Sequence, residues 1–260
     1  VFGHPSGLFG GPVSMGSLVL NLYLLGPGVW GLKLGNLLIH LANGALVFWL
    51  FRLLSSQGGL TGEASPSAST WLPWLGASFW LLHPLLASSV LYVIQRMAML
   101  SALFTLLAII SYLLGRIALL QGRTRTGWST LALIPGWTLL AALSKENGIL
   151  APALCAVIEL VLFMPRSSGR MRQLSIGLVV CTLALPALAA AFLTALQHPL
   201  IVEGYANRPF DLVERLLTQP RVLWSYVAAL LVPNGPSLGI YHDAYPLSKS
   251  LFDPPATVLA

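Results

Sequence analysis

Leu-rich apolar runs of about 20 residues recur along this 260-residue chain, and they constrain the fold more than any other feature. A helix of roughly 20 apolar residues is long enough to cross a hydrocarbon core of about 30 Å. Hydrophobic residues make up 56% of the chain and charged residues only 8%, against roughly 25% charged in a soluble domain. The sequence therefore predicts an all-α integral membrane protein, a polytopic transmembrane helix bundle with amphipathic surface helices on its outer face.

Six segments predict helices that span the membrane. We expect them in a core over residues 32–196, near 32–54, 71–92, 97–115, 128–144, 148–164 and 174–196. Residues 1–31 predict an outer-face loop with a short amphipathic helix at 14–26, and residues 197–260 predict a second outer-face segment. In that segment, 205–226 is typical of an amphipathic surface helix, and 221–232 is too short for a crossing and indicates a re-entrant or surface helix.

The distribution of basic residues predicts the orientation of the helices. Arg residues gather in alternate connections, which should face the cytoplasm; they are Arg52, Arg116, Arg123, Arg125, Arg166, Arg170 and Arg172. The opposite turns hold only Arg96 and Lys145, so these turns and both outer-face segments should face outward, to the periplasm of a bacterial inner membrane or to the ER lumen in a eukaryote. Because the inside connections explain 7 of the 14 cations, the net charge of +6 requires no nucleic-acid partner.

The tetrapeptide Ser144–Asn147, which contains Lys145 and Glu146, interrupts an apolar stretch at the outward turn between the fourth and fifth crossings. One interpretation is a polar interfacial turn, in which Asn147 and Gly148 supply the turn backbone. The alternative is a binding site. Polar residues at the neighbouring outer helix ends favour that alternative.

His83 and Arg96 are those neighbouring polar residues. His83 and Pro84 lie near the outer end of the second crossing, where Pro84 is expected to kink the helix and His83 is either a hydrogen-bonded structural residue or a ligand contact. Arg96 opens the third crossing, although the helix dipole disfavours a cation at that position. Arg96 therefore predicts an anionic partner, either Glu146 or a ligand phosphate, which an arginine fork binds bidentately.

Two further groups of polar residues have open roles. Arg208, Arg215 and Arg221 are interleaved with aromatic residues, so they belong either to the polar face of a surface helix or to a site for an anionic lipid headgroup. Asp243, beside His242 in an expected loop, is a weak candidate for chemistry.

The first crossing carries a polar stripe. Asn36, His40 and Asn43 are spaced by four and three residues, which places them on one helical face together with Lys33. This stripe should face the bundle. Hydrogen bonding to a neighbouring helix is favoured over direct substrate contact.

Three segments, in this order and at these separations, resemble a known family. They are "LKLGNLLIHLANGALVFWLF", "LLHPLLASSVLYVIQRMAMLSALFTLLAIISYLLGR" and "LLAALSKENGIL", and they look like the multi-spanning core of GT-C glycosyltransferases, nearest to the TMTC-type protein O-mannosyltransferases and their bacterial tetratricopeptide-repeat relatives. The resemblance covers residues 12–165 well and extends to the bacterial members after that. It implies transfer of a sugar from a polyprenyl-phosphate carrier to a protein or glycan acceptor on the outer side of the membrane.

The resemblance also implies roles for individual residues. The acidic motif of the family lies upstream of this sequence, so we expect the chain to be a piece of a longer protein that lacks the catalytic carboxylate. The implied reaction is inverting: that carboxylate deprotonates an acceptor hydroxyl, while cations stabilise the phosphate leaving group. The expected substrate-binding residues are Arg96, Lys145, Glu146, His83, Arg208, Arg215 and Arg221, and the candidates here for a catalytic role are Glu146, His83 and Asp243.

Alternative functions stay open at this point. A polyprenyl-linked glycan polymerase or ligase would also gather cations at outer helix ends, and a structural scaffold would give them no role. A lipid-linked sugar transporter or flippase predicts repeated halves and paired broken helices at mid-membrane, whereas the polar residues here cluster at one face. No cofactor or metal is expected, because no carboxylate cluster is present and Cys155 and Cys181 lie in apolar runs as small hydrophobes.

Overall fold

The computed structural model describes residues 11–56, 66–206, 211–233, 245–250 and 253–257. These residues fold into helices joined by short turns and contain no named strand, which confirms the all-α class. The chain divides into two compact units, Val1–Leu188 and Ala189–Ala260. Each unit is described by itself.

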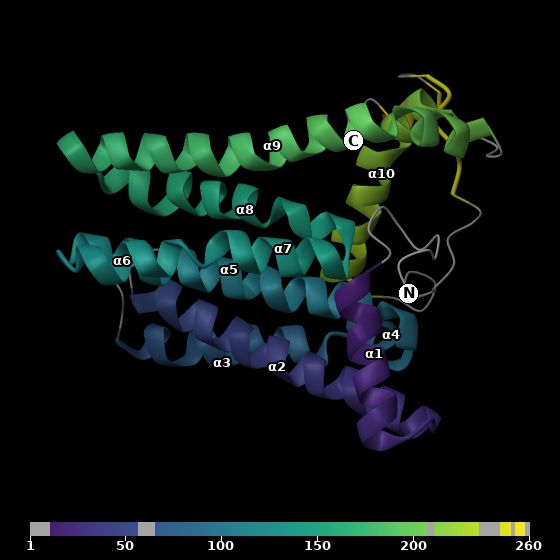
Figure 1. The fold of residues 1–260 in the computed structure, drawn as a ribbon, viewed down its shortest axis with the longest axis horizontal. Coiled ribbons are helices and arrows are strands. Elements are labelled where there is room, and N and C mark those ends of the chain that lie inside the picture. The colour runs from purple at the N-terminus through teal and green to yellow at the C-terminus, as the bar shows by residue number, and fades with distance from the viewer. Residues whose placement is uncertain (1–10, 57–65, 207–210, 234–244, 251–252, 258–260) are drawn as a thin grey trace. The chain divides into compact units, whose positions relative to one another are not determined.

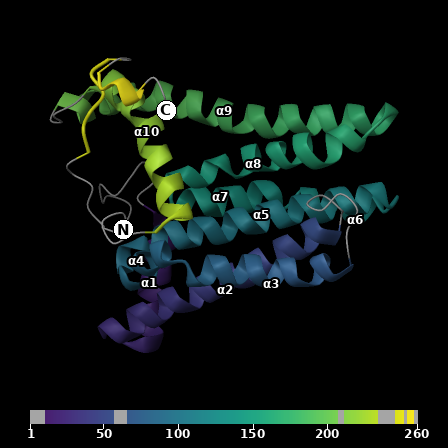
Figure 2. The same ribbon diagram turned by 180° about the vertical axis from the view of Figure 1, so that it is seen from behind.

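The first unit is a bundle of helices. It contains α1 (Pro12–Leu25), α2 (Val29–Ser56), α3 (Pro66–Leu82), α4 (Ala87–Leu91), α5 (Arg96–Leu120), α6 (Thr124–Leu131), α7 (Ile134–Ser144), α8 (Ala151–Ile158) and the start of α9 (Gly169–Ala206). Short 3-10 turns at Pro84–Leu86, Val93–Gln95, Glu146–Leu150 and Met164–Arg166, and a π-helical turn at Glu159–Phe163, extend or connect them. Helices α2, α3, α5, α7 and α8 run side by side, and α1 lies across one end of them (Figures 1 and 2).

Four helical segments are long and apolar enough to cross a membrane, namely Val29–Ser56, Val93–Leu120, Thr124–Ser144 and Glu146–Arg166. A fifth results if Thr70–Leu82 and Pro84–Leu91 form one span bent by 48°. The first five expected crossings overlap these segments, the second of them only if the bent pair is one span. The sixth lies inside α9, several of whose side chains fall outside the described residues.

The bend between α3 and α4 is a full break of the helix. Pro84 has no N–H to continue the hydrogen-bond ladder, and His83 adopts an extended backbone with φ −65° and ψ 124°. The His83 Nδ1 atom accepts a hydrogen bond from the Leu85 N–H at 3.2 Å, which caps the next turn. The kink expected from the sequence is therefore confirmed.

Helix α5 occupies the centre of the first unit, where it contacts α2, α6, α7 and α8. Its buried residues Ala108, Tyr112 and Leu113 pack against Ile134 and Cys155. Close packing of this kind is the main source of helix association where lipid surrounds the bundle.

Polarity in the first unit is inverted relative to a soluble domain, in which polar residues face outward. The buried polar residues include Asn36, His40, Asn43, Arg96, Arg116, Ser144 and Glu159. Large apolar side chains instead cover the outside, among them Trp49, Leu75, Phe79, Leu139 and Val161. An apolar exterior with paired polar groups inside is what a lipid environment selects, and together with the long apolar helices it makes this chain a membrane protein.

The second unit is built around α10 (Leu212–Leu231). Asp211 and Glu214 form a capping box at its start, with the Glu214 N–H donating to Asp211 Oδ1 at 2.7 Å and the Asp211 N–H donating to Glu214 Oε2 at 3.0 Å. The sequence predicted two overlapping helical segments here, 205–226 and 221–232, whereas Leu212–Leu231 is one continuous helix with Pro220 inside it. The capping box fixes the helix start at Leu212, eight residues before the proline.

Candidate functional site

The expected site residues of the first unit gather at the end of the bundle that α1 crosses, which we call the α1 end. Arg96 begins α5, and Lys145 directly follows α7. Gly11, the residue before α1, lies between these two positions, because a Cβ added to it would stand 2.9 Å from Met97 Cε and 3.3 Å from the Ser144 carbonyl oxygen. The fold therefore brings the start of α5 and the end of α7 together beside the start of α1.

Arg96 is almost fully buried, with 1% of its surface exposed. Its Nε donates to Asn36 Oδ1 at 2.7 Å, and its Nη2 donates to Asn21 Oδ1 at 2.8 Å and to the Leu32 carbonyl at 2.7 Å. Its Nη1 donates to the Ser17 carbonyl at 3.3 Å. The guanidinium thus ties α1 and α2 to the start of α5.

The partners of Arg96 differ from the expected anionic group. All four acceptors are neutral, and the ion pair found among the described residues joins Arg116 to Glu159, not Arg96 to Glu146. Amide and carbonyl oxygens satisfy the N–H donors without cancelling the charge. Arg96 therefore leaves a net positive charge at the α1 end while most of its hydrogen-bonding capacity is used inside the protein.

Lys145 lies half-buried at the turn between α7 and the next 3-10 turn, with extended backbone at φ −156° and ψ 144°. Its side chain makes no hydrogen bond or ion pair within the described part of the chain. Glu146 is also half-buried, and the exposed Asn147 accepts a hydrogen bond through Oδ1 from Ser101 Oγ of α5 at 3.4 Å. The turn is therefore packed against α5 while Asn147 stays exposed.

Gly148 explains how this turn packs so closely. A Cβ at this position would overlap the Ala141 backbone and stand 2.6 Å from the Ala142 backbone nitrogen. Backbone atoms cannot move aside as a side chain can. Only glycine permits this approach of the turn to α7.

Gly148→Ala is therefore expected to lower the free energy of unfolding by about 1–3 kcal/mol through overpacking, measured by thermal unfolding in detergent. Gly136→Ala, in α7, is the matched control because its added Cβ meets nothing within 4 Å. That control should be neutral or stabilising by roughly 0.5–1 kcal/mol. Equal stability of the two variants would contradict the packing argument.

His83 lies at the α3–α4 break, also at the α1 end. It is 6% exposed, and its ring meets Phe79 edge-on at 5.1 Å between ring centroids. Its Nδ1 already caps the next turn. The Nδ1 atom of His83 therefore has a structural role, and the residue lies at the α1 end together with Arg96.

The polar stripe of α2 faces the bundle, which confirms the prediction for Asn36, His40 and Asn43. Each side chain donates to a backbone carbonyl of a neighbouring segment, and His40 also stacks on Trp80 with ring centroids 4.8 Å apart. The bonds are Asn36 Nδ2 to Val90 O (3.2 Å), His40 Nε2 to Leu81 O (3.1 Å) and Asn43 Nδ2 to Met99 O (2.9 Å).

A buried ionic network near the opposite end of the bundle was not foreseen. Glu159 accepts hydrogen bonds from Tyr112 Oη at 2.6 Å and from Arg116 Nε and Nη2 at 2.7 and 2.6 Å. Arg116 Nη2 also donates to Ser175 Oγ at 3.1 Å, and the guanidinium stands 5.0 Å from the centroid of the Phe163 ring. Arg116 and Glu159 are both 0% exposed.

The placement of Arg116 in a cytoplasmic connection was therefore wrong. The residue lies inside α5, four residues before its end, because the apolar run continues to Leu120. Glu159, the single carboxylate in the apolar run 148–164, supplies the opposite charge that makes burial possible. That isolated Glu was the signal that sequence analysis missed.

Of the four candidate site residues in the second unit, the structure describes two, Arg215 and Arg221. Arg208 and Asp243 lie outside the described residues. Arg215 is exposed on α10, whereas Arg221 Nη1 donates to the Pro246 carbonyl and to Ser248 Oγ, both at 3.0 Å. Arg221 thus holds residues 245–248 against α10 and has less capacity left for a ligand.

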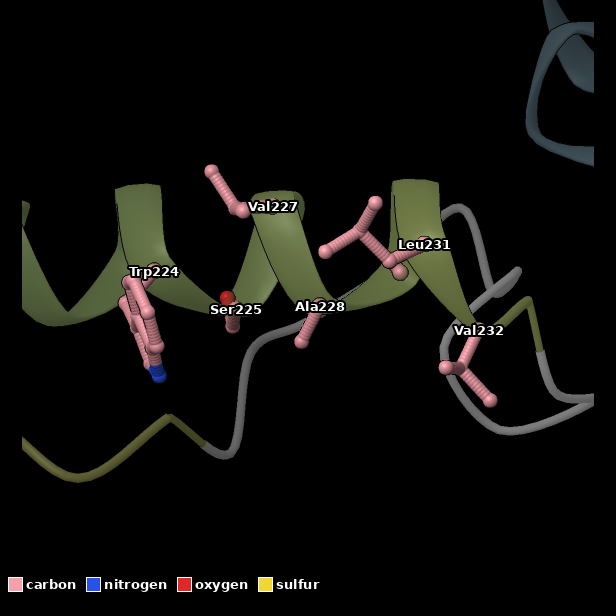
Figure 3. A pocket seen from close by; sticks show the side chains of 7 residues that line it. Trp224, Ser225, Val227, Ala228, Leu231 and Val232 are labelled. Atoms are coloured by element: carbon pink, nitrogen blue, oxygen red, sulfur yellow. The ribbon is translucent and has the colours of Figure 1, made fainter.

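An open apolar hollow lies along the last turns of α10. Figure 3 shows side chains from Trp224 to Val232 that line it. Neither Arg215 nor Arg221 lines this hollow. The basic residues of α10 and its apolar hollow are therefore separate features, and no cationic side chain lines the hollow.

No protein-family model, characterised protein or solved structure matches this chain. Within the described residues, no three His, Cys, Asp or Glu side chains lie close enough to hold a metal ion. Function is therefore inferred from the chain's own residues, above all from the cations at the α1 end.

Proposed function

We propose that this chain is part of a membrane glycosyltransferase that moves a sugar from a polyprenyl-phosphate carrier to a protein or glycan acceptor at the α1 end. The half-buried Lys145 side chain, without a partner in the described part of the molecule, is the observation that carries the proposal. The uncancelled charge of Arg96 lies at the same end. Two such cations beside an apolar, lipid-facing exterior favour a lipid-borne anion.

Lys145 and Arg96 have different roles in this proposal. Arg96 forms four hydrogen bonds within the protein, so it positions α1 and contributes a positive field without gripping the ligand. Lys145 has its ammonium group available, and it is the residue that contacts the phosphate. Glu146 and His83 lie at the same end and would orient the donor.

The chemistry needs charge stabilisation on the leaving group. When the bond between the anomeric carbon and the phosphate oxygen breaks, negative charge grows on the lipid phosphate, and the Lys145 ammonium stabilises that charge. The acceptor hydroxyl attacks the opposite face of the anomeric carbon, so the configuration inverts. A carboxylate takes the hydroxyl proton, and the family resemblance implies an acidic side chain in this role.

A transporter or flippase is the main alternative, and the broken helix at His83 is the feature that favours it. Transporters, however, bind substrate at discontinuous helices near the bilayer midplane. The break here lies near the α1 end, just before Arg96 begins α5. A glycan polymerase or ligase would use the same cations and differ in its acceptor.

Sugar transfer by the full-length protein in proteoliposomes, with a labelled polyprenyl-phosphate sugar as donor, tests the proposal. Lys145→Ala should lower turnover by roughly 10²–10³-fold, as loss of one charge-stabilising donor does in other enzymes, and Lys145→Arg should retain part of the activity. Lys249→Ala, which removes an exposed lysine of the second unit, should leave turnover unchanged. Wild-type turnover in a folded Lys145→Ala protein would refute the assignment, and transport of the donor without transfer would favour the flippase.

A further inference from the structure

Three exposed arginines flank the tight connection between the 3-10 turn Met164–Arg166 and α9, at the end of the bundle opposite α1. They are Arg166, Arg170 and Arg172, and we call them the arginine turn. Gly169, with φ +52°, closes the connection. The chain thus presents three cations within seven residues at one helix end.

The fold itself offers little to stabilise these charges. Arg170 and Arg172 lie in the first turn of α9, where the positive end of the helix dipole disfavours cations. Arg166 Nη1 donates to the Leu162 carbonyl at 2.7 Å, whereas the side chains of the other two arginines make no hydrogen bond with described residues. An external anion would supply what the fold does not.

Carboxylates that could neutralise the arginine turn are missing from the described part of the first unit. Glu146 lies at the α1 end, and Glu159 is buried and already paired with Arg116. The other exposed arginines of the same end, Arg52 and Arg125 among them, add further positive charge. This end therefore complements a negatively charged surface.

The face of α9 that carries Arg172 continues as an apolar stripe. Ile176, Val180 and Leu183 follow at intervals of four, four and three residues, so all lie on one helical face. They are 46%, 58% and 45% exposed, respectively. A cationic residue at the rim followed by an exposed apolar stripe matches the two parts of a phospholipid, headgroup and acyl chain.

We propose that the arginine turn is a binding site for an anionic phospholipid. The guanidinium groups of Arg170 and Arg172 bind the headgroup phosphate, for which their planar fork is suited, and an acyl chain lies along Ile176, Val180 and Leu183. The stripe selects a lipid over free phosphate, because inorganic phosphate would leave these apolar side chains uncovered. The site is independent of sugar transfer at the other end of the bundle.

Lipid enrichment during purification tests the site. The full-length protein is equilibrated with vesicles of phosphatidylcholine containing a minor share of phosphatidylglycerol, extracted, and its retained lipids are quantified by mass spectrometry. Each arginine near a membrane surface contributes roughly fivefold to anionic lipid binding, so wild type should enrich phosphatidylglycerol about 25-fold over the bulk ratio. Arg170→Gln/Arg172→Gln should return the retained lipid to nearly the bulk composition.

Two matched double variants distinguish lipid binding at the arginine turn from attraction by the overall positive charge of this end of the bundle. Arg170→Lys/Arg172→Lys keeps both charges and should keep most of the enrichment. Arg52→Gln/Arg125→Gln removes two charges of the same end, from α2 and α6, and should change the enrichment little, because neither residue belongs to the arginine turn. Equal losses in the two glutamine pairs, or unchanged enrichment in Arg170→Gln/Arg172→Gln, would overturn the proposal. Loss of wild-type enrichment when inorganic phosphate is added at constant ionic strength would assign the turn to free phosphate instead.

Discussion

Replacing Arg116 by Leu is expected to lower the free energy of unfolding by about 3–5 kcal/mol, because the variant leaves the buried Glu159 carboxylate without its countercharge. Only the Tyr112 hydroxyl, at 2.6 Å, would still donate to that carboxylate. The network joins α5 to the segment after α8 and, through Ser175, to α9. Denaturation in mixed detergent micelles, followed by circular dichroism, measures the loss.

The double variant Arg116→Leu/Glu159→Leu is the control for this prediction. It removes both charges, and apolar replacement of a buried ion pair is often neutral or stabilising. The double variant is expected to regain the stability lost in Arg116→Leu, because Arg116 Nη1 is buried without a hydrogen-bond partner and the native network is therefore incompletely satisfied. A single Arg116→Leu variant as stable as wild type, or a double variant weaker than the single one, would show that the ion pair does not act in this way.

Local sequence patterns predicted most of the first unit. Apolar runs locate helices because length and composition alone decide whether a segment suits the membrane. The spacing of Asn36, His40 and Asn43 fixed one face of α2, and burial of polar groups in lipid left only the bundle interior for them. Pro84 predicted the break in the helix because its chemistry acts on the adjacent turn.

Long-range pairing was beyond those patterns. Arg116 and Glu159 stand 43 residues apart, and Arg96 and Asn36 stand 60 apart, so no local rule shows that they meet. An arginine near the end of an apolar run also fits a membrane-surface position, which is why Arg116 was assigned to a connection. Burial of a charge costs free energy that only a partner inside the bundle offsets, the Glu159 carboxylate for Arg116 and amide and carbonyl oxygens for Arg96.

Helix α1, at the candidate site, is a second case in which local sequence patterns could not predict a long-range contact. Its sequence predicted an amphipathic surface helix, but its buried residues are Ser14 and Asn21, whereas Tyr23 is 85% exposed and Leu24 66%. The polar side of α1 faces the bundle because Arg96 lies beneath it. Which face of a short helix turns inward thus depended on a residue 75 positions away.

Arg96→Met is expected to release α1 from the bundle. The change leaves Asn36 Oδ1 and Asn21 Oδ1 without their donor, and each buried acceptor left unsatisfied costs about 1–3 kcal/mol, so the interface should lose roughly 2–6 kcal/mol. The remainder of the bundle keeps its own contacts, including the Asn43–Met99 bond. Detachment should therefore be local and should precede global unfolding.

Cysteine protection measures that detachment directly. Ser14 is 0% exposed, so Ser14→Cys, in a background where the exposed Cys181 is replaced by Ser, should react slowly with a water-soluble maleimide. Adding Arg96→Met should speed the reaction at least tenfold, since 1.4 kcal/mol corresponds to a factor of ten, while Arg96→Lys should give an intermediate rate because it keeps the charge but fewer hydrogen bonds. Tyr23→Cys sets the rate of a largely exposed thiol on the same helix. If Ser14→Cys reacts equally slowly with and without Arg96, the Arg96 guanidinium does not hold α1 against the bundle. In that case Arg96 would contribute only its positive charge to the proposed donor site, without positioning α1.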